Sequence, residues 1–117
     1  ADSALLAACE KAAQKLGFTF HTGITRSHDS FYTDREEEID AYWSAHGVLG
    51  CDMETAALYV IGRLRQVRCM SILNNVVAYQ TDTADAIGSY ASGEEAAMRG
   101  EEHEIVTALE ALASLSV

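Results

Sequence analysis

The chain has 117 residues, with 18 acidic and 8 basic side chains, three cysteines and a formal net charge of −10. A domain commonly takes about 100–150 residues, so the length leaves room for one domain. Nucleic-acid backbones and anionic membrane surfaces both attract basic patches, so the acidic balance argues against either as the main partner. The cysteines show no C-x-x-C motif and no zinc spacing, which favours reduced thiols in a cytosolic protein. No apolar run is long enough to cross a membrane and the first residues do not resemble a secretory signal, so we expect a cytoplasmic protein.

The first part of the sequence predicts a helix, a strand and a second helix. Over residues 3–16, apolar and small side chains recur on one helical face, and a glycine follows as a natural stop. Alternation and a high Thr and Phe content favour a strand over residues 18–25. Thr33 begins a T-x-x-E capping box that closes on Glu36, so the second helix should begin directly after Thr33 and run to about Ala45.

The middle of the chain predicts a strand that leads directly into a helix. Residues 48–52, V-L-G-C-D, form a short apolar run, and residues 53–65 have helical periodicity. The residues expected on the packed side of this helix are Ala56, Ala57, Val60, Ile61 and Leu64.

The last part predicts one more strand and one more helix. Residues 67–77 are apolar enough for a strand buried on both faces, and residues 78–91 are typical of a loop. Ser92 and Glu95 form a second capping box, which opens the final helix. The resulting order, α-β-α-β-α-β-α, indicates a layered α/β fold.

The D-M-E sequence at residues 52–54 lies where a predicted strand ends and a helix begins. Open α/β sheets bind ligands at the carboxyl ends of their strands, so carboxylates are well placed there. Glu54 can accept hydrogen bonds from two adjacent hydroxyl groups, such as those of a ribose. The alternative is that Asp52 caps the helix and Glu54 only complements the helix dipole.

Two motifs occur in this order, S-H-D-S-F-Y at residues 27–32 and G-V-L-G-C-D-M-E-T-A-A-L-Y at residues 47–59. Together they resemble the nucleoside phosphorylase family, in particular its uridine phosphorylases and hexameric bacterial purine nucleoside phosphorylases. The stretch Y-A-S-G-E-E-A-A-M-R-G-E-E at residues 90–102 is also similar to members of that family. The resemblance implies a three-layer α/β/α phosphorylase-type fold, with residues 1–117 as the C-terminal part of a single domain. Family members are longer, and their phosphate ligands lie in the half that this sequence does not match.

The resemblance implies reversible phosphorolysis of a nucleoside, with uridine favoured, to free base and ribose 1-phosphate. Phe31 matches the aromatic residue that stacks on or flanks the base, and Met53 matches the residue packed against the sugar. Glu54 matches the carboxylate that holds the ribose hydroxyls. Asp52 stands where the family usually has Glu, and a substrate-binding role is implied for it as well.

Asn75 and Arg35 are the remaining residues for which the resemblance implies a role. Asn75 lies where bacterial purine enzymes and related nucleosidases have an Asp that protonates the purine. An amide supplies no proton at neutral pH but can hydrogen-bond to a base, so Asn75 would stabilise the departing base and favours a pyrimidine. Uridine phosphorylases carry Gln and Arg shortly after the F-Y pair, where they read uracil, and the matching positions here hold Arg35 and Glu37. Arg35 either reaches a carbonyl group or stays solvated at a helix start.

The resemblance further implies a nucleoside as substrate, inorganic phosphate as co-substrate, and no metal or organic cofactor. It implies a homo-oligomer, either a dimer or a hexamer built of dimers. Three alternatives stay open: a purine nucleoside phosphorylase, a nucleosidase of the same fold that uses water, and a chain that is inactive without an N-terminal half.

Overall fold

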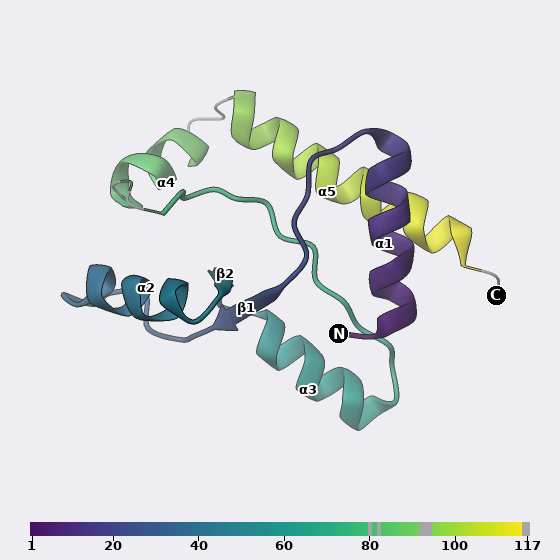
Figure 1. Ribbon diagram of the computed structural model, residues 1–117, viewed down its shortest axis with the longest axis horizontal. Helices are drawn as coiled ribbons and strands as arrows, with labels where there is room; N and C mark the ends of the chain where they lie inside the picture. The colour runs from purple at the N-terminus through teal and green to yellow at the C-terminus, as the bar shows by residue number, and fades with distance from the viewer. Residues whose placement is uncertain (80, 82, 92–94, 116–117) are drawn as a thin grey trace. The chain divides into compact units, whose positions relative to one another are not determined.

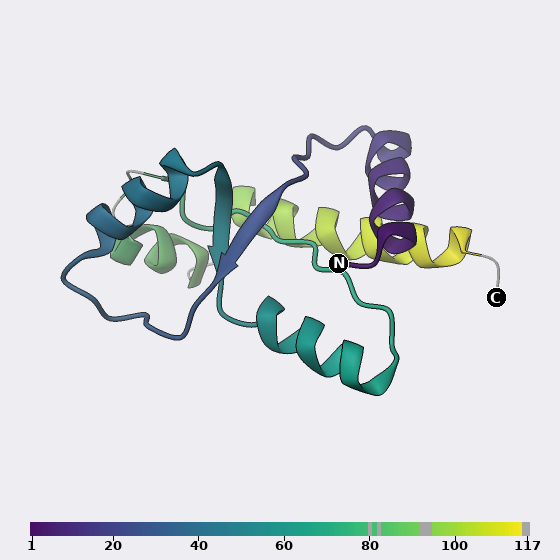
Figure 2. The same ribbon diagram turned by 60° about the horizontal axis from the view of Figure 1, so that its bottom comes forward.

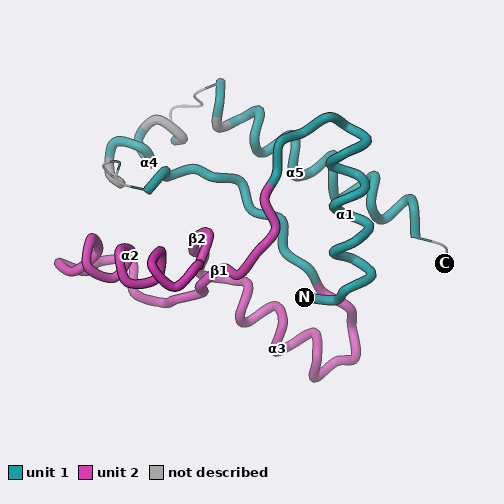
Figure 3. The backbone as a smooth tube through the Cα atoms, in the orientation of Figure 1, with its two compact units in different colours: residues 1–20, 70–117 teal, residues 21–69 magenta. Residues whose placement is uncertain are grey.

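The computed structural model describes residues 1–79, 81, 83–91 and 95–115. The described residues form two compact units, unit 1 with residues 1–20 and 70–117 and unit 2 with residues 21–69 (Figure 3). In chain order the elements are α1 (Ser3–Leu16), β1 (Ile24–Ser27), α2 (Glu36–Ala45), β2 (Val48–Asp52), α3 (Thr55–Arg65), α4 (Thr83–Ala91) and α5 (Glu95–Ser114), as labelled in Figure 1. Over this part of the chain, no helix has the length and apolar character needed to cross a membrane.

In unit 1, α1 has the bounds that the sequence predicts, and local interactions fix both of its ends. The Asp2 carboxylate accepts hydrogen bonds from the backbone N–H groups of Ala4 and Leu5, each at 3.0 Å. Gly17 ends the helix in the left-handed region, at φ 73°, where a residue without a Cβ is favoured.

Small residues form the contact between α1 and α5. Ala8, Ala12 and Ala111 make a buried cluster, so the two helix backbones approach closely. Lys15 forms an ion pair with Glu110. At the end of α1, the Phe18 ring stacks on His103, with 3.8 Å between ring centroids and 13° between ring planes.

Two predictions for the last part of the chain are wrong. No strand forms over residues 67–77, because a strand exists only in a hydrogen-bonded ladder and this segment pairs with no other strand of the described chain. The predicted loop over residues 78–91 contains α4 instead. The predicted final helix is α5, and its proposed capping residue Ser92 lies outside the described residues.

Unit 2 is built on a parallel strand pair, β1 and β2, joined by α2 (Figure 2). β2 has the predicted bounds. β1 begins at Ile24, later than the predicted strand over residues 18–25, because Ile24 is the first residue with a partner in the ladder, Val48. At the other end, Ser27 pairs with Asp52.

α2 begins two residues later than its predicted capping box requires. Arg35 is the N-cap residue, and Thr33 Oγ1 accepts a hydrogen bond from the Arg35 backbone N–H at 3.2 Å instead of capping the helix. Three glutamates, at positions 36 to 38, occupy the first turn and complement the positive end of the helix dipole. No residue of α2 is buried.

The predicted packed face of α3 is present but exposed. Val60, Ile61 and Leu64 have exposed fractions of 60%, 58% and 76%. The buried residues of the helix are Thr55 and Gly62, on its opposite side. The periodicity therefore identifies one apolar face correctly, while the prediction that this face is packed within the described chain is wrong.

Candidate functional site

The pairing of β1 and β2 brings the two sequence motifs to the same edge of the sheet. Ser27, the last residue of β1, lies opposite Asp52, the last residue of β2. The His28 backbone N–H donates to the Asp52 carbonyl oxygen at 3.0 Å, which extends the ladder by one bond. The loop that carries Phe31 and the turn that carries Glu54 therefore both start at the carboxyl ends of parallel strands, where α/β proteins bind ligands.

The Asp52 carboxylate organises the turn between β2 and α3. Its Oδ1 accepts hydrogen bonds from Ser27 Oγ at 2.9 Å, Glu54 N at 2.9 Å and Thr55 N at 2.6 Å. Its Oδ2 is buried and accepts no hydrogen bond from the described residues. Asp52 thus accepts from the backbone N–H groups of Glu54, the N-cap residue, and of Thr55, the first residue of α3, which agrees with the helix-start role that the sequence offered as the alternative. A direct contact between Asp52 and a nucleoside stays a prediction.

Burial raises the pKa of Asp52, but hydrogen bonds from Thr55, Ser27 and Glu54 outweigh it and hold the pKa below its ordinary value of 3.8. A carboxyl group with a lowered pKa in the folded state stabilises the fold while it is ionised. This contribution is present above the unfolded-state pKa, which is about 3.9 for Asp. It is lost as the pH falls through the folded-state pKa.

This linkage predicts the acid response of an Asp52→Asn variant. The amide keeps an acceptor oxygen for capping but removes the charge, so we expect the variant to be less stable than the parent chain near neutral pH. The difference should shrink as the pH falls below about 4 toward the folded-state pKa, because Asp52 is protonated first in the unfolded chain and only at lower pH in the folded one. Urea unfolding followed by circular dichroism at several pH values measures both quantities. Asp29→Asn, an exposed carboxylate in the loop after β1, is the matched control, and an equal pH response in the two variants would contradict the assignment.

Glu54 is exposed at the N-cap position of α3. Its Oε2 accepts a hydrogen bond from the Met53 backbone N–H at 3.0 Å, so the carboxylate lies against its own turn. Met53 is 41% exposed beside it. A carboxylate has two oxygens and about four acceptor positions, so Glu54 has room for further hydrogen bonds beside this one.

Ser27 is a site residue to which the sequence analysis gave no role. Its hydroxyl group donates to Asp52 Oδ1 and accepts from the Ala56 backbone N–H at 2.9 Å. One side chain therefore ties the end of β1 to the end of β2 and to the first turn of α3. Its position as the first residue of the S-H-D-S-F-Y motif was the available signal.

Phe31 and Arg35 lie in unit 2, in and after the loop that follows β1. Phe31 is 49% exposed and packs edge-on against Tyr32, with 5.1 Å between ring centroids. The Arg35 guanidinium donates to both carboxylate oxygens of Glu38, at 2.9 and 2.8 Å. This bidentate contact lowers the pKa of Glu38. Arg35 is thus held on the first turn of α2, which agrees with the alternative in which it stays solvated at a helix start. A contact between Arg35 and the base stays a prediction.

Asn75 belongs to unit 1, whereas the other predicted site residues belong to unit 2. Asn75 is exposed, while its neighbour Asn74 is half-buried. The Asn74 side chain occupies the space that a Cβ at Gly100 would need. The Asn74 backbone N–H also hydrogen-bonds to the Glu104 carboxylate. Asn74 therefore anchors the chain around residues 74 and 75 to α5. Of the two amide side chains, Asn75 is the exposed one.

No metal centre accompanies these residues in the part of the chain that is described, where no group of three or more His, Cys, Asp or Glu side chains is arranged to hold an ion. The chemistry available at the sheet edge is hydrogen bonding by carboxylates, packing by a thioether and stacking on an exposed aromatic ring.

Comparison with known proteins gives the same family in sequence and in structure. The family model of the phosphorylase superfamily matches residues 1–112. The purine nucleoside phosphorylase (DeoD-type) of Roseobacter denitrificans is 38% identical over 80 residues, which cover 68% of this chain and 34% of that protein. The uridine phosphorylase of Salmonella typhimurium is 31% identical over 91 residues, covering 66% of this chain and 36% of that protein.

Solved structures of uridine phosphorylase from Vibrio fischeri are similar over nearly the whole chain. The structure with 6-hydroxy-1-naphthoic acid has a TM-score of 0.82 and 43% sequence identity, and it covers 98% of this chain. The match takes up 46% of the solved chain. The present chain therefore has a phosphorylase-type α/β fold and spans less than half of the length of the proteins that it matches.

Proposed function

The chain belongs to the phosphorylase superfamily, and from this premise we propose that it carries the base- and ribose-binding side of a nucleoside phosphorylase. One observation carries the proposal. The loop with Phe31 and the turn with Glu54 both begin at the carboxyl ends of the paired strands, after Ser27 and Asp52. We propose that residues 1–117 are the C-terminal part of a single phosphorylase domain, whose other part supplies the phosphate ligands.

In the proposed reaction, the bond between the anomeric carbon and the base nitrogen breaks while a phosphate oxygen bonds to the same carbon. The sugar becomes cation-like as the base departs with the bonding electron pair. Glu54 accepts hydrogen bonds from the ribose hydroxyls and thereby orients the sugar for attack. Phe31 and Met53 enclose the base and the sugar, and Asp52 and Ser27 hold the turn that presents Glu54.

We propose Asn75 and Arg35 as the groups that hydrogen-bond to the base. An amide offers both a donor and an acceptor, which suits the carbonyl and N–H groups of uracil. Arg35 has to leave its exposed ion pair with Glu38, and such a pair contributes little stability. No metal or organic cofactor has a part in this proposal, and inorganic phosphate is the co-substrate.

Uridine is the proposed substrate, because the similar solved structures are of uridine phosphorylases with 43% identity. A purine nucleoside is the second candidate, since the DeoD-type relative of Roseobacter denitrificans is 38% identical. We further propose a cytoplasmic homo-oligomer that serves nucleoside salvage, as the acidic composition and the reduced cysteines accord with such a setting.

Base release with and without phosphate tests the function. The chain, assembled with the rest of a phosphorylase domain, should release uracil from uridine only when phosphate is present, and ribose 1-phosphate should accumulate in equal amount. Parallel assays with inosine decide between the pyrimidine and the purine. Release at the same rate without phosphate would indicate a nucleosidase. Failure to release any base would refute both the phosphorylase and the nucleosidase hypothesis.

A further inference from the structure

The first N–H groups of α3 bond to side chains from outside the helix. The leading N–H groups of any helix lack partners within it and need acceptors from elsewhere. Asp52 Oδ1 accepts from the backbone N–H groups of Glu54 and Thr55, at 2.9 and 2.6 Å. Ser27 Oγ, at the end of β1, accepts from the Ala56 N–H at 2.9 Å. The start of α3 thus depends on a side chain from the neighbouring strand as well as on the turn that precedes the helix.

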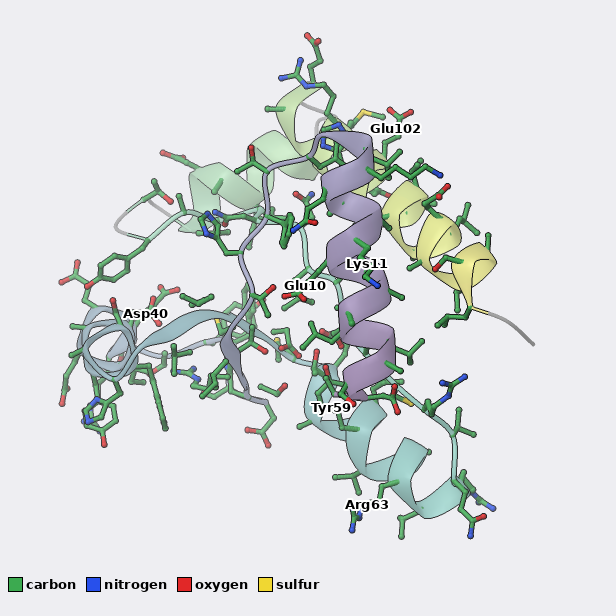
Figure 4. The ribbon with its side chains drawn as sticks, turned by 45° about the vertical axis from the view of Figure 1, so that its right-hand side comes forward. Glu10, Lys11, Asp40, Tyr59, Arg63 and Glu102 are labelled. Atoms are coloured by element: carbon green, nitrogen blue, oxygen red, sulfur yellow. The ribbon has the colours of Figure 1, made fainter. Side chains whose placement is uncertain are left out.

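Glu54 occupies the N-cap position of α3 but does not cap the helix. An N-cap side chain normally accepts from the N–H of the second or third helical residue, and Ser, Thr, Asp and Asn are preferred there. Ala56 is the second helical residue, and its N–H bonds to Ser27, whereas the Glu54 side chain makes no capping bond. After the first turn, the next polar side chains of α3 are Tyr59 and Arg63, which Figure 4 shows farther along the helix. The N-cap carboxylate is therefore not used for capping.

The partners of the Ser27 hydroxyl group fix its direction. Its O–H donates to the Asp52 carboxylate at 2.9 Å, which leaves the lone pairs of Oγ for the Ala56 N–H. A hydrogen bond to a carboxylate is stronger than one between neutral groups, so this direction is favoured. The register of the ladder places Ser27 opposite Asp52, and both residues are half-buried. The strand pairing itself therefore supplies α3 with its capping acceptor.

We propose that Ser27 is a positioning residue of the nucleoside site. By accepting the Ala56 N–H, it leaves the Glu54 carboxylate to accept hydrogen bonds from the ribose hydroxyls. Without the Ser27 hydroxyl, the carboxylate at the N-cap position would take that N–H itself, because an anion is stabilised at the positive end of a helix. This role rests on the proposed function of Glu54, since Ser27 acts only through that carboxylate.

Amide NMR spectra of the chain test the change of acceptor without any turnover. In Ser27→Ala, the Ala56 N–H resonance should move as carboxyl groups ionise over about pH 3–6, and adding Glu54→Gln should remove most of that movement. In the parent chain, Glu54→Gln should leave the pH response of the Ala56 resonance unchanged. Asp52 is the other carboxylate of this turn, and it is present in both members of each pair, so its contribution cancels.

Kinetics of the assembled phosphorylase test the effect on the site. Ser27→Ala should lower kcat for uridine by about tenfold in the parent background and by less than about twofold in the Glu54→Gln background. A residue that acts through the Glu54 carboxylate has little left to affect once that carboxylate is absent. Ser44→Ala, the same change at an exposed position of α2, is the matched control and should leave kcat unchanged.

Two further variants separate the hydroxyl group from the shape of the side chain. Ser27→Thr keeps the hydroxyl and should restore the parent behaviour in both measurements. Ser27→Val has nearly the shape of Thr without the hydroxyl, and should behave as Ser27→Ala. The comparison of Thr with Val at this position therefore gives the same test if Ser27→Ala fails to fold.

Two results would overturn the proposal. One is an Ala56 resonance whose pH response in Ser27→Ala does not depend on Glu54. The other is an equal loss of kcat from Ser27→Ala in the parent and Glu54→Gln backgrounds, which would give Ser27 a structural role alone. An assembled parent enzyme that releases no base would instead refute the proposed function. The NMR comparison would still decide whether Ser27 keeps the Glu54 carboxylate from capping.

Discussion

The Glu54→Gln variant of the assembled phosphorylase should release base from uridine about 100-fold more slowly than the parent, or slower still. In the proposed site the carboxylate accepts from both ribose hydroxyls, whereas the amide presents one acceptor and one donor, so one hydroxyl would lose its partner and the sugar its orientation. The measurement is kcat and KM for uridine at saturating phosphate, with the main loss expected in kcat.

Glu102→Gln is the matched control for this substitution, because it makes the same chemical change at an exposed position of α5. It should leave kcat and KM unchanged. An unaltered rate in Glu54→Gln would refute the ribose-binding assignment, whereas an equal loss in both variants would assign the effect to charge rather than to the site.

Replacing Ala111 with Leu should destabilise unit 1 by about 1–3 kcal/mol, the usual cost of adding carbon atoms to a filled core. Ala111 is 1% exposed and packs with Ala8 and Ala12 where α1 meets α5. The larger side chain has to push the helices apart. Urea unfolding followed by circular dichroism measures the loss.

Ala113→Leu tests whether packing is the cause, because Ala113 is exposed on the same helix. Its free energy of unfolding should stay within about 0.5 kcal/mol of the parent value. Equal destabilisation by the two substitutions would show that the Ala111 contact does not hold unit 1 together.

The features predicted correctly are those that depend on residues close together in the sequence. α1 follows from a helical pattern that ends in Gly17, and β2 follows from a short apolar run that leads into the D-M-E turn. The hydrogen bonds of Asp52 at the start of α3 depend on residues two and three positions away. Each signal lies within its own element or within a few residues of it, so no knowledge of the rest of the fold was needed.

The errors arise where distant segments decide the structure. Residues 67–77 have the composition of a buried strand, but composition does not supply the neighbouring strand that a ladder needs. α4 is nine residues long and contains Gly88, so its sequence was not distinguished from a loop. The motif marked Ser27 as a candidate, but its hydrogen bond to Asp52 could not be predicted, because the two residues are 25 positions apart and only strand pairing brings them together.

The contact between α1 and α5 has a consequence for the order of events during synthesis. Lys15 and Glu110 are 95 positions apart, so at about 5–20 residues per second the ribosome needs roughly 5 to 20 seconds to supply the partner of α1. During this interval the three alanines of α1 that are buried in the folded chain, Ala8, Ala12 and Ala13, stay uncovered. Their methyl groups present less apolar surface than larger side chains at the same positions would. The residues of α1 that are buried last during synthesis are therefore the smallest apolar ones.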